Sequence, residues 1–171
     1  MQYRTNRRTS LAALMALSLA AASPPAIKAW AQSSEPTGPQ AELPKEKLVI
    51  VSRTGATHVF NVEMALTAEQ QQTGEMFRTA VPADGGMLFD WGIPRPSQMW
   101  MKNTPASLDM VFINAGGSIR SIAENTVPRS LAVVDSRGPV RATLELAAGT
   151  TARLDIRVGD KVQQRIFGTQ P

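Results

Sequence analysis

The chain has 171 residues, no cysteine, and 18 Lys and Arg residues against 14 Asp and Glu residues. The lack of cysteine excludes thiolate catalysis and cysteine-ligated metal, but it fits an oxidising or a reducing compartment equally well. Four of the basic residues, Arg4, Arg7, Arg8 and Lys28, precede Gln32, so the rest of the chain is formally neutral. A basic surface for nucleic acid is therefore not expected.

Residues 1–31 have the features of a secretory signal peptide. A basic start is followed by an apolar run from Leu11 to Ala22 and by Ala29-Trp30-Ala31, a small-x-small site that predicts cleavage after Ala31. The run is shorter than the ~20 apolar residues of a membrane span, so no stable span is expected after cleavage. We expect a periplasmic or extracellular protein. Arg7-Arg8 loosely fits the twin-arginine route, although the next residues favour the general secretory route.

The remaining sequence divides into a linker and one domain. Residues 32–46 are rich in Ser, Pro, Gly and Glu and have little to bury, which predicts a flexible linker. Residues 47–168 are the right length for a single β-rich domain with one core.

The domain opens with a predicted hairpin and a helix. Apolar and polar residues alternate over residues 48–53 and 58–65, on either side of the turn-forming pair Thr54-Gly55. Thr67 and Gln70 then match a capping box, in which each side chain satisfies a free backbone donor of the other residue. This motif predicts a helix that begins after Thr67 and continues to Phe77.

The rest of the domain is predicted to be β-structure. A Pro-rich loop is expected at residues 93–96, a sheet with one wet face at 140–146, and a short helical turn at 150–154. The other expected strands cover residues 87–89, 98–104, 108–114, 118–124 and 161–167. Eight or so short strands with one short α-helix predict a mainly β fold, either a jelly-roll-like β-sandwich or a partly open barrel.

Several segments resemble the family known as domain of unknown function 192. They include Gly74-Glu75-Met76-Phe77-Arg78, Gly86-Met87-Leu88-Phe89, Trp100-Met101-Lys102-Asn103-Thr104 and Leu108-Asp109. The resemblance implies a small, jelly-roll-like β-domain, often in exported bacterial proteins, and implies no established activity. Family members commonly have Leu at the position of Glu75 and an aromatic residue at the position of Met99.

A candidate site follows from pairing residues 98–104 with residues 108–114 across Pro105. If Thr104 faces Asp109, then Lys102 lies diagonal to Asp109, about 7 Å away, and shares a face with Trp100. Charges on such an apolar surface either pair with each other or serve a ligand. The two interpretations are an ion pair that fixes the strand register and a ligand-binding cleft.

The second interpretation gives a set of candidate ligand-binding residues. Lys102 with Asn103 or Thr104 would donate to an anionic or hydroxylated ligand, Trp100 would stack on it, and Asp109 would orient the lysine. Arg78, Arg95 and Glu124 are candidates for the rim. The expected function is non-catalytic binding of a small polar ligand or glycan, without cofactor or metal. Trp91, next to Gly92, is expected to be more exposed than Trp100.

The sequence is also compatible with other functions. Lys102 and Asp109 could form the acid/base pair of a cofactor-free hydrolase or isomerase. A sheet edge could dock on another envelope protein, and the oligomeric state is undetermined. A copper site of Met99, Met101 and His58 is disfavoured, because methionines two apart on a strand are typical of a core. No Gly-x-Ser-x-Gly motif supports a serine hydrolase.

Overall fold

The computed structural model describes residues 35–169, so the predicted signal peptide lies outside the described residues. Most of the described chain forms a seven-stranded sheet in the order β5-β4-β6-β3-β2-β1-β7. The strands are β1 (Lys45–Val51), β2 (Thr57–Ala65), β3 (Gly85–Met99), β4 (Leu108–Ile113), β5 (Ile119–Ala123), β6 (Val134–Ala147) and β7 (Lys161–Gln163). The helices are α1 (Ala68–Thr73), α2 (Thr150–Arg153) and the 3-10 turn η1 (Arg165–Phe167).

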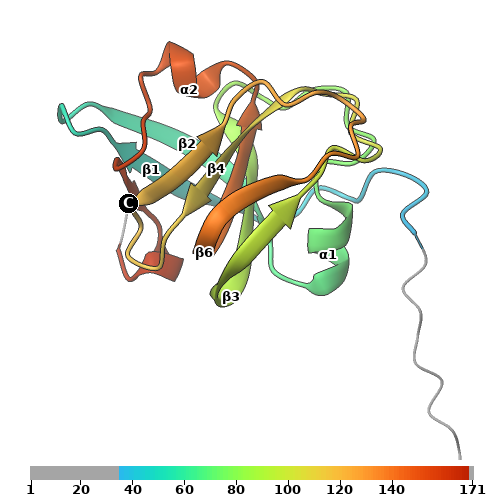
Figure 1. Ribbon diagram of the computed structural model, residues 1–171, viewed down its shortest axis with the longest axis horizontal. Coiled ribbons are helices and arrows are strands. Elements are labelled where there is room, and N and C mark those ends of the chain that lie inside the picture. The colour runs from blue at the N-terminus through green and yellow to red at the C-terminus, as the bar shows by residue number, and fades with distance from the viewer. Residues whose placement is uncertain (1–34, 170–171) are drawn as a thin grey trace, which may run out of the picture. The chain divides into compact units, whose positions relative to one another are not determined.

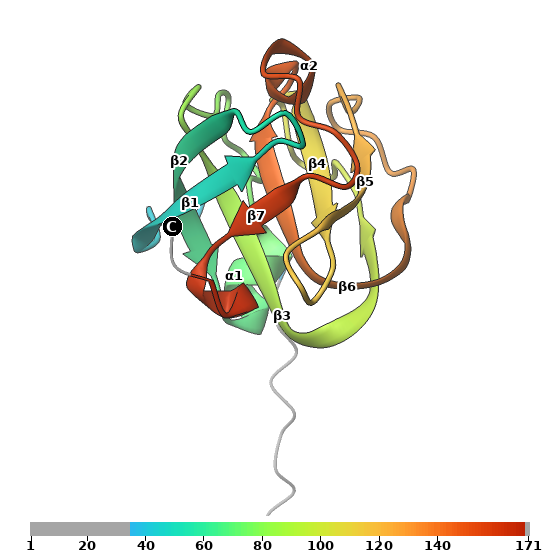
Figure 2. The same cartoon turned by 90° about the vertical axis from the view of Figure 1, so that its left-hand side faces the viewer.

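The sheet curls so that its two edge strands approach each other (Figures 1 and 2). A single β-bridge joins Ser118, just before β5, to Lys161 in β7. The Val162 amide donates to the Gly117 carbonyl at 2.7 Å, and the Ile119 amide donates to the Asp160 carbonyl at 2.9 Å. The predicted partly open, mainly β architecture is confirmed.

The inside of the curled sheet holds the main core. Phe60, Val62 and Met64, which share one face of β2, are each at most 2% exposed, as their alternation predicts. They pack with Leu88 of β3 and Leu144 of β6. The antiparallel pairing of β1 with β2 confirms the predicted opening hairpin, whereas β2 pairs with β3 in parallel.

The outside of the sheet is also apolar over β3 and β4. Met87 and Phe89 of β3 and Met110 and Phe112 of β4 are each at most 1% exposed. Residues 140–146 were expected to leave one face wet, and that prediction is wrong, since Glu145 on that face is only 3% exposed. A covering layer that includes α1 buries this outer face. The side-chain amide of Gln71 in α1 donates a hydrogen bond of 2.7 Å to the Asp90 carbonyl of β3.

Helix α1 begins as predicted but ends earlier. Both halves of the Thr67–Gln70 capping box are formed. The helix stops at Thr73, not Phe77, because Gly74 takes a positive φ of 48° and packs against the Phe89 ring, 2.9 Å from where a Cβ would lie. A residue other than glycine would be strained at this position.

The predicted hairpin of residues 98–104 with 108–114 is wrong. Strand β3 ends at Met99, and the Thr104 amide donates 3.0 Å to the Met101 carbonyl, which closes a turn. Asn103 in this turn has a left-handed φ of 55°. Strand β4 pairs with β5 and β6, while β3 runs through the expected Pro-rich loop and pairs irregularly with β6.

Part of the predicted linker is packed on the domain. The Gln40 side chain donates to the carbonyls of Gln70 and Gly74 at 3.1 and 3.0 Å, and the Leu43 amide donates to Glu63 at 2.8 Å. Strand β1 begins at Lys45, two residues before the predicted domain boundary. Within residues 35–169, the helices are all too short or too polar to cross a bilayer.

Candidate functional site

A cavity of about 470 Å³ lies between α1 with the residues after it and the outer face of the sheet. We call it the α1–β3 cavity. Its lining residues are Ala68, Gln71, Gln72, Thr73, Gly74, Glu75, Met76, Phe89, Trp91, Arg95, Gln98, Met99, Trp100, Thr104 and Glu145. This volume falls in the range of about 300–1,000 Å³ that is typical of small-molecule sites.

Aromatic rings form part of the cavity wall. Trp91 stacks on Phe89 with the ring centroids 5.7 Å apart, and the Arg95 guanidinium lies 4.5 Å from the centroid of the Trp91 ring. The Trp91 indole N–H donates to the Thr143 hydroxyl at 3.2 Å, which fixes the ring orientation. Trp100 is 48% exposed. The cavity therefore presents both a fixed and an accessible aromatic surface.

Two buried carboxyl groups also line the cavity. Glu145 on β6 and Glu75 after α1 are each 3% exposed. Burial raises the pKa of Glu145 well above its ordinary value, and the nearby charge of Glu75 adds to this rise. Burial likewise raises the pKa of Glu75 to about 7, although the charge of Arg78 opposes the shift. Burial thus favours the protonated form of Glu145, and Glu75 changes its protonation near neutral pH.

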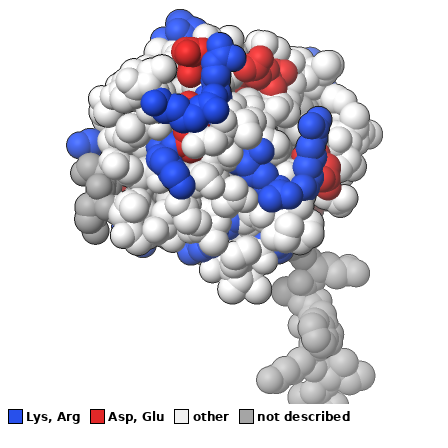
Figure 3. Space-filling view, turned by 60° about the vertical axis from the view of Figure 1, so that its left-hand side comes forward, with Lys and Arg blue, Asp and Glu red and all other residues white. Residues whose placement is uncertain are grey.

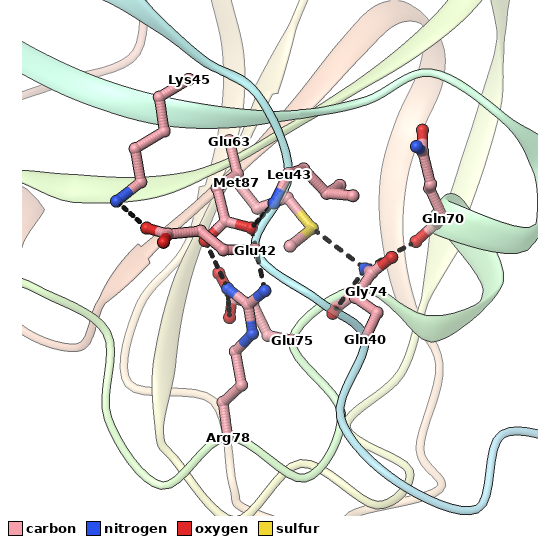
Figure 4. Close-up of polar contacts among 10 residues, drawn as sticks. All are labelled: Gln40, Glu42, Leu43, Lys45, Glu63, Gln70, Gly74, Glu75, Arg78 and Met87. Carbon is pink, nitrogen blue, oxygen red and sulfur yellow. Dashed lines mark hydrogen bonds and ion pairs between the residues drawn. The ribbon is translucent and has the colours of Figure 1, made fainter.

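Arg78 links Glu75 to a third carboxylate (Figure 4). Its guanidinium donates to the two oxygens of Glu63 at 2.6 and 2.8 Å and to Glu75 at 3.2 Å. Burial alone would raise the pKa of Glu63, but hydrogen bonds from Arg78 and the Leu43 amide outweigh it and lower the pKa. Glu63 is therefore the ionised partner of Arg78. Glu75 receives the longer and weaker contact.

The family of the chain is settled by comparison with known sequences. The family model of domain of unknown function 192, DUF192, described as "Uncharacterized ACR", matches residues 49–164. The chain belongs to this family. Among curated proteins there is no significant match.

Two solved structures resemble this DUF192 domain. One, from Sinorhizobium meliloti 1021, is a protein proposed to be a transcription regulator; it shares 45% identity and a TM-score of 0.72, over 74% of this chain and 98% of that one. The other, from Novosphingobium aromaticivorans DSM 12444, is a protein of unknown function with 36% identity and a TM-score of 0.69, over 71% and 86% of the two chains.

The DUF192 domain separates two residues that were predicted to pair. Lys102 instead binds both oxygens of Glu35, at 2.6 and 2.7 Å, and its Nζ lies 5.2 Å from the centroid of the Trp100 ring. Asp109 is fully buried and accepts from backbone amides of Asn125, Gly149 and Thr151 at 2.9, 3.1 and 2.9 Å. The predicted Lys102–Asp109 ion pair is therefore wrong, because the hairpin that would form it does not exist.

Only three of the predicted site residues line the α1–β3 cavity: Arg95, Trp100 and Thr104. Lys102 and Asn103 lie beside it around a smaller hollow that Trp100 shares. Glu124 lies 3.1 Å from the Thr151 hydroxyl in a separate surface depression. Arg78 lines a neighbouring pocket, which Glu75 shares with it.

The relative exposure of the two tryptophans is the reverse of the prediction. Trp100, expected mid-strand, follows the end of β3 and is half-exposed, whereas Trp91 is held inside β3 by its hydrogen bond to Thr143. Met101, one of the methionines considered for copper, is 1% exposed and packs in the apolar layer with Met110 and Phe112. Its interpretation as a core residue is confirmed.

Sequence reasoning missed the two buried carboxyl groups. Glu145 alternates with Leu144 and Leu146, a pattern that equally predicts a wet strand face. The only available signal for Glu75 was its departure from the leucine that family members commonly have there. An unexpected acid in an otherwise apolar motif indicates either a surface position or a specialised buried one.

Proposed function

We propose that this DUF192 protein is an exported binding protein whose α1–β3 cavity holds a small polyhydroxylated molecule, such as a mono- or disaccharide. The cavity volume, about 470 Å³, suits a ligand of one or two sugar rings. Its walls combine aromatic rings with polar side chains, the mixture that sugars require, because each sugar ring has an apolar face and a polar edge.

The observation that carries this proposal is that Glu145 is buried, faces the cavity and has no hydrogen-bond partner among the described residues. The residue is 97% buried, since only 3% of it is exposed, and it lines the cavity. Among residues 35–169, no side chain or amide donates a hydrogen bond to it. Buried polar groups nearly always have a partner, and one that faces a cavity can obtain it from a ligand. Gln72 and Gln98 on the same cavity offer further donors and acceptors.

Trp91 and Trp100 make the proposal easy to test, because they are the only tryptophans after Ala31. Titration of the protein with glucose, N-acetylglucosamine and glucosamine should change the tryptophan fluorescence and give a saturable curve. Trp91→Ala should weaken binding about tenfold or more, since loss of an aromatic stacking surface costs roughly 1–3 kcal/mol. Leu131→Ala, an exposed residue outside the cavity, is the matched control. Absence of saturable binding for all three sugars would refute the proposal.

Export is a separate part of the proposal and has its own test. The support is the order of basic, apolar and small residues over residues 1–31. Expression of the full chain in a bacterium, followed by fractionation and N-terminal sequencing, should give a periplasmic or secreted form that begins at Gln32. A cytoplasmic form that retains Met1 would contradict export.

Nucleic-acid binding is the alternative suggested by the Sinorhizobium relative, which is proposed to be a transcription regulator. The net charge argues against this function, because the chain after Ala31 has 14 basic residues and 14 acidic residues and is formally neutral. On the face drawn in Figure 3, Lys and Arg side chains lie in several separate places, and some of them adjoin Asp or Glu. Fluorescence anisotropy with duplex DNA at low salt should show no binding, since phosphate contacts dominate affinity under that condition.

A further inference from the structure

Glu145 is buried, and it has no charged partner among the described residues. Its neighbours in the sheet are Met87 on β3 and Met110 on β4, both fully buried. No described residue neutralises or hydrogen-bonds its carboxyl group. Burial of an ionised carboxylate among methionines is very unfavourable without a cation.

Glu75 shares its only cationic partner among the described residues with Glu63. Arg78 is the only cation bound to the buried acids on this side among the described residues, and it lies closer to Glu63, at 2.6 Å, than to Glu75, at 3.2 Å. One guanidinium thus binds two carboxyl groups, and Glu145 is a third buried carboxyl group that Arg78 does not contact. The other charged group facing the cavity is Arg95 on β3, which is exposed and stacks on Trp91.

We propose that the bound molecule carries an amino group and that Glu75 and Glu145 bind this group at the sheet side of the α1–β3 cavity. This inference rests on the proposed function and narrows it from polyhydroxylated molecules to aminated ones, such as amino sugars. An ammonium group has three donors and a positive charge, so it donates to the unpartnered oxygens of Glu145 and stabilises the ionised forms of Glu75 and Glu145. A neutral hydroxyl group does only the first.

The protonation of the two acids provides an independent signature. Burial raises the pKa of Glu145 and brings the pKa of Glu75 to about 7. An ammonium ion favours the ionised form of both, so binding at neutral pH is accompanied by release of protons to solvent. Arg78 and Glu63 are already paired and ionised. The released protons therefore come from Glu75 and Glu145.

Matched sugars test the inference by isothermal titration calorimetry at about pH 7. Glucosamine should bind about tenfold tighter than glucose or N-acetylglucosamine, which lack the charge. Its apparent binding enthalpy should change between phosphate and Tris, buffers of different ionisation enthalpy, in the direction of proton release. Glucose should show no such buffer dependence.

Two variants connect the preference to the two acids. Glu145→Gln and Glu75→Gln keep the side-chain shape, and each should reduce the preference for glucosamine to about twofold or less and reduce proton release. Thermal unfolding verifies that each variant is folded. Glu69→Gln, an exposed acid on α1 outside the cavity, should leave preference and proton release unchanged.

The outcomes separate this inference from the proposed function. If glucose and N-acetylglucosamine bind as tightly as glucosamine, the aminated ligand is refuted and saccharide binding stands. The same conclusion follows if both glutamine variants retain the full preference. If none of the three sugars binds, both the inference and the proposed function are refuted.

Discussion

Arg78 and Glu63 form a two-point ion pair between the segment after α1 and strand β2, with oxygen–nitrogen distances of 2.6 and 2.8 Å. Both side chains are largely buried, at 19% and 8% exposed. The same carboxylate accepts the Leu43 amide, so the pair also fastens the segment that precedes β1 (Figure 4). The covering layer over the outer face of the sheet therefore depends on this contact.

Arg78→Ala should lower the free energy of unfolding by about 3–5 kcal/mol, because it leaves buried carboxylates without their cation. Arg165→Ala removes an ion pair with Glu46 that is half-exposed on the arginine side, and it should cost about 0–1 kcal/mol. Urea unfolding followed by circular dichroism measures both. Equal losses in the two variants would show that the Arg78 pair has no special role.

Glu75 should make the protein less stable as pH rises toward neutrality. Its pKa is raised from the ordinary 4.5 to about 7, so the folded state binds more protons than the unfolded chain between these values. The free energy of unfolding then falls with rising pH across that window, and Glu145 extends the fall to higher pH. Glu63 has a lowered pKa, so its contribution to the free energy of unfolding is lost only when the pH falls below its ordinary value of 4.5.

Glu75→Gln removes this dependence without changing the shape of the side chain. The melting temperature of the variant relative to wild type should increase between about pH 5 and about pH 8. Differential scanning calorimetry at the two pH values gives this comparison. A constant difference between variant and wild type would mean that Glu75 titrates like an exposed acid.

The sequence predicted those parts of the fold that depend on local patterns. The β1–β2 hairpin and the Thr67 cap follow from alternation and from hydrogen bonds within four residues. The path of residues 98–114 could not be predicted in this way. Residues 98–104 and 108–114 both look like strands, but β4 pairs with β6, which is distant in sequence, and this pairing decides where the chain turns.

Part of the predicted candidate site lies at the α1–β3 cavity, and part lies elsewhere. Trp100 and Thr104 line the cavity because the segment after β3 folds back beside the segment after α1, whereas Arg95 reaches it from β3 itself. Lys102 and Asp109 were chosen from a strand register that does not form. Glu145 was missed because the covering layer that buries it comes from α1 and the segment after α1, and alternation along β6 carries no information about such a layer.

Thr67→Ala should lower the free energy of unfolding by about 1 kcal/mol, since the Thr67 hydroxyl accepts the Gln70 amide at the start of α1. Gln70 contributes the reciprocal bond to the Thr67 amide at 3.0 Å. Thr79→Ala, at an exposed position without a side-chain hydrogen bond in the described part of the chain, is the control and should be close to neutral. A double variant of Thr67 and Gln70 should be less destabilised than the sum of the single changes.

Asp109→Asn tests the structural role that the hydrogen bonds of Asp109 indicate. Asp109 Oδ2 accepts both the amide and the hydroxyl of Thr151, at 2.9 and 2.7 Å, and Oδ1 accepts the amides of Asn125 and Gly149. The carboxylate thereby ties β4 to the loop after β5 and to the start of α2. An asparagine side chain has one NH₂ group in place of an acceptor, so two of these donors would face another donor.

The expected loss from Asp109→Asn is about 2–4 kcal/mol, since each buried donor left without an acceptor costs roughly 1–3 kcal/mol. Asp84→Asn, at an exposed position, should change stability by less than about 0.5 kcal/mol. Sugar binding by the folded Asp109→Asn variant should stay within about twofold of wild type, because Asp109 does not line the α1–β3 cavity. A variant that keeps full stability but loses binding would return Asp109 to the binding site and contradict the cavity assigned from Glu145.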